Sequence, residues 1–136
     1  MKTARGTGTA LDVSTRLWHH GDVAMGPAKA DLLDAIAATG SISNAGRATN
    51  VSARRAAQLV DLMNRNFAKP LVHSTTGSAR LTDMGLLVLS RYRAMQAALD
   101  ATAARHADGL ADLLLRSPQP APAEPTQICT GSADSI

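Results

Sequence analysis

The stretch GSISNAGRATNVSARRAAQLVDLMN, from Gly40 to Asn64, decides the fold. It reads as a short helix, a break at residues 50–52 and a second helix. Ser41 or Ser43 can cap the first helix and Ser52 the second, because a serine hydroxyl accepts a hydrogen bond from a free backbone N–H at a helix start. The stretch therefore predicts two helices joined by a tight turn.

The second helix is expected to run to about Phe67 and to bury one face. Its apolar residues recur at the three- and four-residue spacing of a helix that packs on a core. Its polar residues fall elsewhere on the cylinder, where they are free to meet a partner. The expected buried face comprises Ala56, Leu59, Val60 and Met63, and the polar residues are Arg54, Arg55, Gln58, Asp61 and Arg65.

Another helix is expected before this pair, from Pro27 to Gly40. Proline suits a first helical turn, and glycine suits a left-handed position at a helix end. Residues 15–26 alternate in character and carry a Gly-Asp break, which predicts a short hairpin ahead of this helix. The apolar stripe of the helix is Leu32, Leu33, Ile36 and Ala37.

Two short extended segments follow the central pair, at residues 71–73 and 79–81, about a turn at residues 76–78. Thr82 is placed to cap a long helix from Asp83 to about Leu115. This order of elements predicts a mainly α fold with a small β wing. We interpret it as a winged helix-turn-helix with a long C-terminal dimerisation helix.

The long helix carries a seam of residues spaced alternately by four and three positions, an imperfect heptad pattern. Such a face either covers the domain's own core or pairs with a second copy. Because a helix this long outruns so small a core, we expect its far end to pair in a homodimer. The predicted dimer interface is Val88, Tyr92, Met95, Leu99, Thr102 and His106.

The chain of 136 residues is expected to form one domain at residues 15–116, with a flexible arm at 1–14 and a disordered tail at 117–136. The tail has four prolines in eight residues and few apolar side chains. The N-terminus has no apolar signal-like segment, no stretch is long enough to span a membrane, and the single Cys129 makes no internal disulfide. A cytoplasmic, nucleoid-associated protein is expected.

In a winged helix-turn-helix, the helix after the turn enters the major groove of DNA and the wing lies along the backbone. Arginine recognises guanine edges with two hydrogen bonds, and glutamine does the same with adenine. Hydroxyl groups and a cation suit phosphate contacts. The predicted DNA-binding residues are Ser43, Ser52, Arg54, Arg55 and Gln58 in the helices and Thr75, Thr76, Ser78 and Arg80 in the wing.

Charge is distributed unevenly along the chain. Between Gly40 and Arg93 there are eight lysines and arginines against two acids, whereas the remainder holds six basic and nine acidic residues. The alternative for the Arg54-Arg55 pair is a solvated helix face with no partner. The concentration of positive charge around the predicted contact helix favours DNA instead.

Other kinds of site have weaker support in the sequence. A metal site would need His19, His20 and His73 to meet, but these residues lack ligand spacing and a placed acid. No nucleophile motif, phosphate-binding loop or pair of carboxylates stands out, so we expect neither an enzyme nor a bound cofactor. Trp18 is expected to fill the core; the alternative is an exposed platform on which a partner stacks.

Several blocks together resemble one family. They are residues 32–47, the pair Met63-Asn64, residues 70–72 and residues 79–85. Over Arg16 to Met95 the chain is similar to the N-terminal DNA-binding domain of the molybdate-responsive transcriptional regulators, the ModE family. The resemblance implies a dimer in which the long helix packs on its twin and two DNA-binding heads lie on one face.

The chain also departs from the family pattern. Ala53 and Ala57 stand where the family carries aromatic residues, and the wing turn lacks the family's glycine run. The C-terminal oxyanion-binding domains of full-length members are not expected here, so molybdate sensing in the usual manner is not supported. We expect a stand-alone dimeric regulator. The alternative is a degenerate winged helix that binds protein and pairs with, or antagonises, a full-length regulator.

Overall fold

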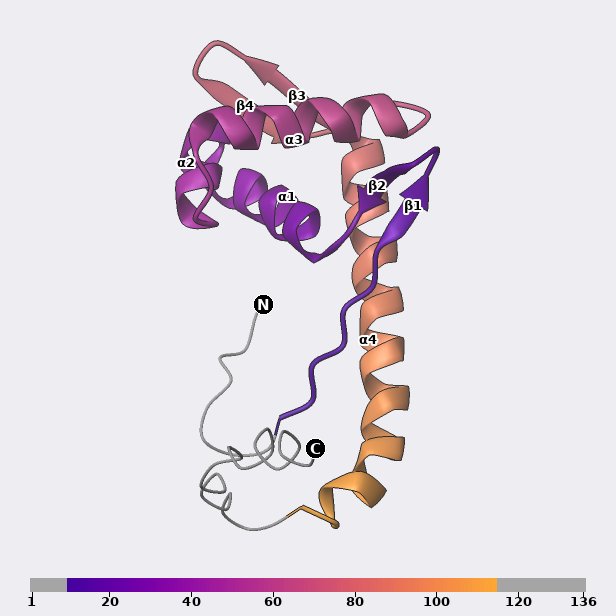
Figure 1. The fold of residues 1–136 in the computed structure, drawn as a ribbon. Coiled ribbons are helices and arrows are strands. Elements are labelled where there is room, and N and C mark those ends of the chain that lie inside the picture. The colour runs from indigo at the N-terminus through magenta and orange to yellow at the C-terminus, as the bar shows by residue number, and fades with distance from the viewer. Residues whose placement is uncertain (1–9, 115–136) are drawn as a thin grey trace, which may run out of the picture.

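The computed structural model describes residues 10–114, which form four helices and two antiparallel hairpins (Figure 1). The predicted arm at 1–14 lies mostly outside these residues, and the predicted tail at 117–136 lies outside them entirely. The mainly helical architecture, with a small wing and a long C-terminal helix, is confirmed. In chain order the elements are β1 (Leu17–His19), β2 (Asp22–Met25), α1 (Pro27–Thr39), α2 (Ile42–Ala48), α3 (Ala53–Asn66), β3 (Val72–Thr75), β4 (Ser78–Leu81) and α4 (Asp83–Ala111).

Side-chain caps fix the starts of three helices. The Ser52 hydroxyl accepts a hydrogen bond from the backbone N–H of Arg55 at 3.0 Å, as expected for the cap of α3. Of the two candidate caps for α2, Ser41 takes the position and accepts from Asn44 at 3.1 Å. Thr82 caps α4 in the same way. Each helix boundary near the predicted site is therefore set by local hydrogen bonds.

The core lies between α1, α3 and the wing. All four residues predicted for the buried face of α3 are buried, and they meet Leu32, Leu33 and Ile36 from α1. Ala37, which the sequence placed on the same stripe, is exposed. Because the apolar side of α3 is used by the core, its polar side is turned outward.

The wing is attached to the helices by backbone bonds. Its strands pair from Val72–Leu81 to Thr75–Ser78, and Gly77, with a φ of 77°, closes the two-residue turn. The N–H of Ala79 donates to the carbonyl of Gly40 at 2.8 Å, which joins β4 to the end of α1. The wing is therefore hydrogen-bonded to the helical part of the domain.

The first hairpin is closed by His20 and Gly21, both in the left-handed region with φ of 50° and 85°. A two-residue turn of this kind matches the twist of the strands it joins. Trp18 on β1 is 64% exposed, so the prediction that it fills the core is wrong. The hairpin buries Ala24 and Met25 instead.

The buried lysine Lys29 connects this hairpin to α1. Its ammonium group donates to the carbonyl of Val23 on β2. Burial lowers the pKa of Lys29, the nearby Asp22 carboxylate raises it, and the positive charge of Arg55 lowers it again. Lys29 thus places a second positive charge within electrostatic range of Arg55.

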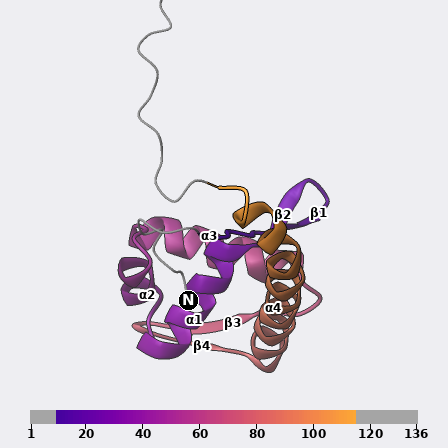
Figure 2. The same cartoon turned by 90° about the horizontal axis from the view of Figure 1, so that it is seen from below.

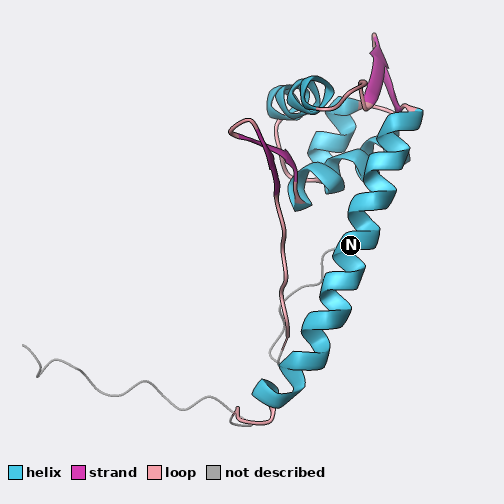
Figure 3. Ribbon diagram, turned by 90° about the vertical axis from the view of Figure 1, so that its right-hand side faces the viewer, coloured by secondary structure: helices cyan, strands magenta, loops and turns pink. Residues whose placement is uncertain are grey.

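Helix α4 begins against the core and then leaves it (Figures 1 and 3). A Cβ atom at Gly85 would overlap the backbone carbonyl of Leu71, so only glycine permits this close approach of the first turn to the start of the wing. The helix spans 29 residues, about 43 Å at 1.5 Å per residue. Its second half therefore extends beyond the rest of the domain.

A guanidinium clamp holds α4 to α1. Arg93 donates to Asp31 at 2.9 Å and to Asp34 at 2.5 Å. Burial lowers the pKa of Arg93, but the hydrogen bonds and charges of the two carboxylates outweigh that effect and raise it. Arg93 is one of the eight basic residues in the positively charged part of the sequence. Within the fold, however, two carboxylates offset its charge.

No helix within residues 10–114 is long and apolar enough to cross a membrane.

Candidate nucleic-acid interface

The first two turns of α3 present an open polar surface. Ser52, Arg54, Arg55 and Gln58 are all exposed, as the sequence predicted. Within residues 10–114, no ion pair or side-chain hydrogen bond engages the guanidinium of Arg54 or of Arg55. Both cations are therefore available to an external partner.

The other end of α3 differs. Arg65 faces Asp61 one turn earlier, with 3.7 Å between the guanidinium and the carboxylate, and both side chains are largely exposed. A surface pair of this kind contributes little to stability, but it offsets local charge. The unbalanced positive charge of α3 is therefore concentrated at its N-terminal end.

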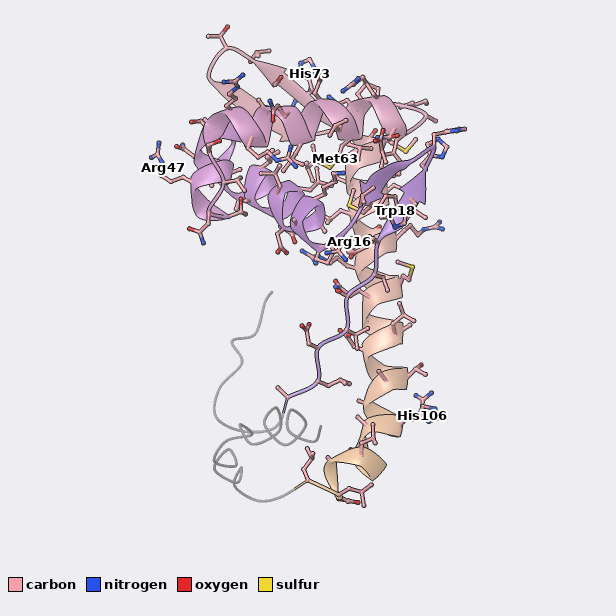
Figure 4. The ribbon with its side chains drawn as sticks, in the orientation of Figure 1. Arg16, Trp18, Arg47, Met63, His73 and His106 are labelled. Atoms are coloured by element: carbon pink, nitrogen blue, oxygen red, sulfur yellow. The ribbon has the colours of Figure 1, made fainter. Side chains whose placement is uncertain are left out.

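Helix α2 supports that end of α3 from the side. A Cβ at Gly46 would lie 3.0 Å from the Cβ of Ala56 and 3.0 Å from the carbonyl oxygen of Val51, so the two helices cross closely because position 46 is glycine. Ser43 is exposed at the start of α2 and Arg47 is exposed near its end (Figure 4). Arg47 was counted in the sequence only as part of the charge excess, and its place beside the turn adds a cation to this surface.

The wing has one buried and one outward face. Val72, Ala79 and Leu81 are buried, whereas Ser78 and Arg80 are exposed on the alternate positions. Thr75 and Thr76 at the tip are exposed as well. All four predicted wing residues are therefore accessible.

His73 also belongs to the outward face of the wing, a role that the sequence did not assign. It is exposed and stands directly across from Arg80 in the β3–β4 register. His19 and His20 lie on the other hairpin, with their ring centroids 4.2 Å apart. Figure 4 shows His73 on the wing and Trp18 on the first hairpin, so the metal site considered from the sequence is not assembled. Nor does any other group of three metal-ligating residues occur between residues 10 and 114.

Asn64 sets the position of the wing relative to α3. Its side-chain oxygen accepts from the backbone N–H groups of Leu71 and Val72 at 2.9 and 3.1 Å, and its amide nitrogen donates to the carbonyl of Val72 at 3.3 Å. In the sequence, Asn64 stands out only as part of the family resemblance. One side chain thus bonds the predicted recognition helix to the start of β3.

We expect Asn64→Ala to lower the free energy of unfolding by about 2–3 kcal/mol, because it leaves two partly buried N–H groups without partners. Asn66→Ala is the matched control, since Asn66 donates only to the Leu62 carbonyl of its own helix. Urea denaturation followed by circular dichroism measures both. Equal, small losses for the two variants would show that Asn64 does not hold the wing.

Residues 29–86 match the family described as Bacterial regulatory helix-turn-helix protein, lysR family. The match covers less than half of the chain, from the first turn of α1 into α4, and includes every predicted DNA contact. It supports a DNA-binding transcriptional regulator of a typically non-enzymatic kind. No curated protein matches the chain.

The predicted self-pairing seam lies on α4, beyond the end of the LysR-type match. Tyr92 does not fit the seam: it is 5% exposed, packs in the core and donates its hydroxyl to the carbonyl of Thr15 at 2.9 Å. Val88 is half-buried against the same core. The remaining seam residues, Met95, Leu99, Thr102 and His106, are exposed.

Exposed apolar side chains continue past the predicted seam, to the end of α4 and just beyond it. Leu110 is 69% and Leu113 is 79% exposed, beyond the last predicted seam residue. The first half of the predicted seam thus packs on the core of its own domain, and only the second half is exposed. Figure 2, which looks along α4 from its far end, shows this helix at one side of the domain.

Proposed function

We propose that the protein is a dimeric transcriptional regulator that binds double-stranded DNA through the N-terminal end of α3. The observation that carries the proposal is the pair Arg54 and Arg55, exposed and unengaged among the described residues, at the start of the helix that follows the turn. Each arginine suits a guanine edge and Gln58 suits an adenine edge in the major groove. Ser52 and the adjoining backbone suit a phosphate.

The wing is proposed to lie along the DNA backbone. Arg80 supplies a cation, and Thr75, Thr76 and Ser78 supply hydroxyl donors, on the outward side of the β3–β4 hairpin. Contacts of this type position a protein on the duplex without reading its sequence. Because Asn64 bonds α3 to β3, the helix and the wing would approach the duplex as one body.

The ModE-type resemblance and the exposed part of the α4 seam support pairing of two copies. In such a dimer each copy contributes one α3, so a single duplex meets two heads. Self-pairing also accounts for the exposure of Met95 and Leu99 on a helix that extends past its own core. Two heads are expected to favour an operator with two related half-sites.

A salt series tests the proposal. If the dimer neutralises roughly 6–8 phosphates, the logarithm of the association constant should fall against the logarithm of salt concentration with a slope of about −5 to −7. Fluorescence anisotropy with a labelled operator fragment from the protein's own genomic surroundings gives this slope. Affinity that is independent of salt, or no binding at low salt, would exclude DNA as the partner.

A second function is favoured by one feature of α3. Ala53 and Ala57 are exposed on the outward side, where two short side chains offer bases little contact. A winged helix of this kind could instead pair with a related full-length regulator through α4 and block it. Mixing the two proteins and separating heterodimers by size would distinguish this function, provided that the chain alone fails to bind DNA.

A further inference from the structure

We propose that His73 is a further DNA contact of the wing and that its imidazole binds a phosphate in the protonated form, so that DNA binds more tightly below neutral pH than above it. This inference rests on the proposed function and adds a proton-dependent contact to the same surface. Its starting point is an exposed histidine directly opposite Arg80 in the β3–β4 register. Figure 4 shows His73 on the wing.

One face of the wing carries four side chains that suit an anion. His73 and Thr75 are two positions apart on β3, and Ser78 and Arg80 are two positions apart on β4, so all four project from the same face. The register pairs His73 with Arg80 and Thr75 with Ser78. Side chains directly opposite one another begin about 5 Å apart, which lets an imidazole and a guanidinium reach the same phosphate group.

The described fold does not neutralise the pair of His73 and Arg80. Within residues 10–114, no ion pair or side-chain hydrogen bond engages either side chain. An imidazolium and a guanidinium at such a distance repel one another unless an anion lies between them. A phosphate that contacts both side chains supplies this anion and gains a charge-assisted hydrogen bond from each.

The elements packed against the wing do not provide such an anion in excess. The end of α1, which is bonded to β4, has no charged residue in its last turn. On α3, Asp61 lies one turn before Asn64, which is bonded to β3, and it faces Arg65. On α4, Asp83 lies in the first turn, where its carboxylate stabilises the helix start. With Lys69 before β3 and the arginine of the wing, these surroundings hold three cations and two carboxylates.

Proton uptake gives the contact a defined dependence on pH. A phosphate attracts an imidazolium more strongly than a neutral imidazole. By linkage, DNA binding and proton binding then favour each other, so the affinity for DNA rises as the pH falls. An imidazole titrates between about pH 5 and 8, so the gain is complete below this range and is lost as the pH rises through it.

The other three histidines of the chain lie away from the proposed DNA contacts. His19 and His20 belong to the first hairpin, where their ring centroids are 4.2 Å apart. Figure 4 shows His106 on the second half of α4, far from the wing. An effect of pH on DNA affinity that comes from His73 can therefore be isolated by substitution.

The test measures the affinity of the full chain for a labelled duplex from its own genomic surroundings, by fluorescence anisotropy at constant ionic strength. We expect binding about tenfold tighter near pH 6 than near pH 8. His73→Gln keeps a polar side chain that does not titrate, so it should bind with the weaker affinity at both values. His73→Lys carries a permanent cation and should bind with the tighter affinity at both.

The salt dependence gives a second measurement that a purely structural role of His73 would not change. Each imidazolium on a phosphate releases a further counterion, so the slope against the logarithm of salt concentration should be steeper near pH 6 by roughly one for each copy bound. In His73→Gln the slope should be the same at both pH values. His106→Gln is the matched control and should keep the behaviour of the unmodified chain.

The outcomes separate this inference from the proposed function. Equal affinity of the unmodified chain near both pH values overturns the inference and leaves the function in place, because DNA is still bound. A pH dependence that survives in His73→Gln also overturns it, because another group then takes up the proton. Absence of binding at low salt and at both pH values removes the proposed function, and this inference with it.

Discussion

Replacing Arg54 and Arg55 together by alanine is expected to weaken operator binding at least 100-fold while leaving the helical content and the dimer unchanged. Each arginine that contacts a base or phosphate contributes about 1–3 kcal/mol, and about 1.4 kcal/mol is a factor of ten. The proposed dimer presents the pair twice. Since both side chains are exposed and hold nothing inside the described fold, their removal should not alter stability.

The matched control removes two cations from the other end of the same segment. Arg65 and Lys69 are both exposed, and Arg65 already faces Asp61. Arg65→Ala with Lys69→Ala changes the net charge by the same amount as the first pair. If the N-terminal end of α3 meets DNA, this control should lose less than tenfold in affinity.

Anisotropy measured over a salt series distinguishes general attraction from a defined contact. The double variant Arg54→Ala, Arg55→Ala should bind more weakly, and its association constant should also depend less steeply on salt concentration. The reason is that fewer counterions are released from the duplex. Similar losses for the two double variants would show that α3 has no preferred DNA-binding end. Full retention of affinity by the Arg54 and Arg55 variant would remove the proposed recognition surface altogether.

Gly85→Ala is expected to lower the free energy of unfolding by about 3 kcal/mol, because the new methyl group would overlap the backbone carbonyl of Leu71. A carbonyl in the main chain cannot rotate away as a flexible side chain does. The wing start or the first turn of α4 must therefore shift. For a domain of this size the midpoint of thermal unfolding should fall by roughly 10–20 °C.

Replacing a second glycine of α4, Gly109, by alanine should raise the free energy of unfolding instead of lowering it. Nothing lies within 4 Å of the position that a Cβ would take at Gly109. Gly109→Ala should therefore stabilise the helix by about 0.5–1 kcal/mol, the usual difference between the two residues in a helix interior. Differential scanning calorimetry at one protein concentration compares the two. Equal changes in both variants would show that α4 does not approach Leu71 as described.

Local features of the fold were predictable from the sequence because they depend on neighbours along the chain. The predicted N-caps of α3 and α4 are Ser52 and Thr82, and both cap those helices. The predicted left-handed end of α1 is Gly40, and α1 ends there. The buried face of α3 follows from its periodicity, and the exposure of Arg54 and Arg55 follows from that face. The recognition surface was thus predictable, whereas its contact with DNA remains a prediction.

Long-range contacts were not predictable in the same way. Arg93 reaches carboxylates 59 and 62 positions earlier, and Asn64 accepts bonds from residues seven and eight positions later across a loop. A heptad pattern does not say which turns face the protein's own core, so Tyr92 was placed at the interface. Trp18 was misplaced because a large indole is usually well buried, while its burial here depends on what packs against the hairpin.

The ion pairs of Arg93 with Asp31 and Asp34 fix the direction of α4 relative to α1. One residue added to α4 between Arg93 and Leu99 would swing everything beyond it by about 100°. In the proposed dimer, the exposed seam residues would then point away from the second copy, while the fold on either side of the insertion stayed intact. Length changes in that stretch should be tolerated only in steps near seven residues, which restore the phase.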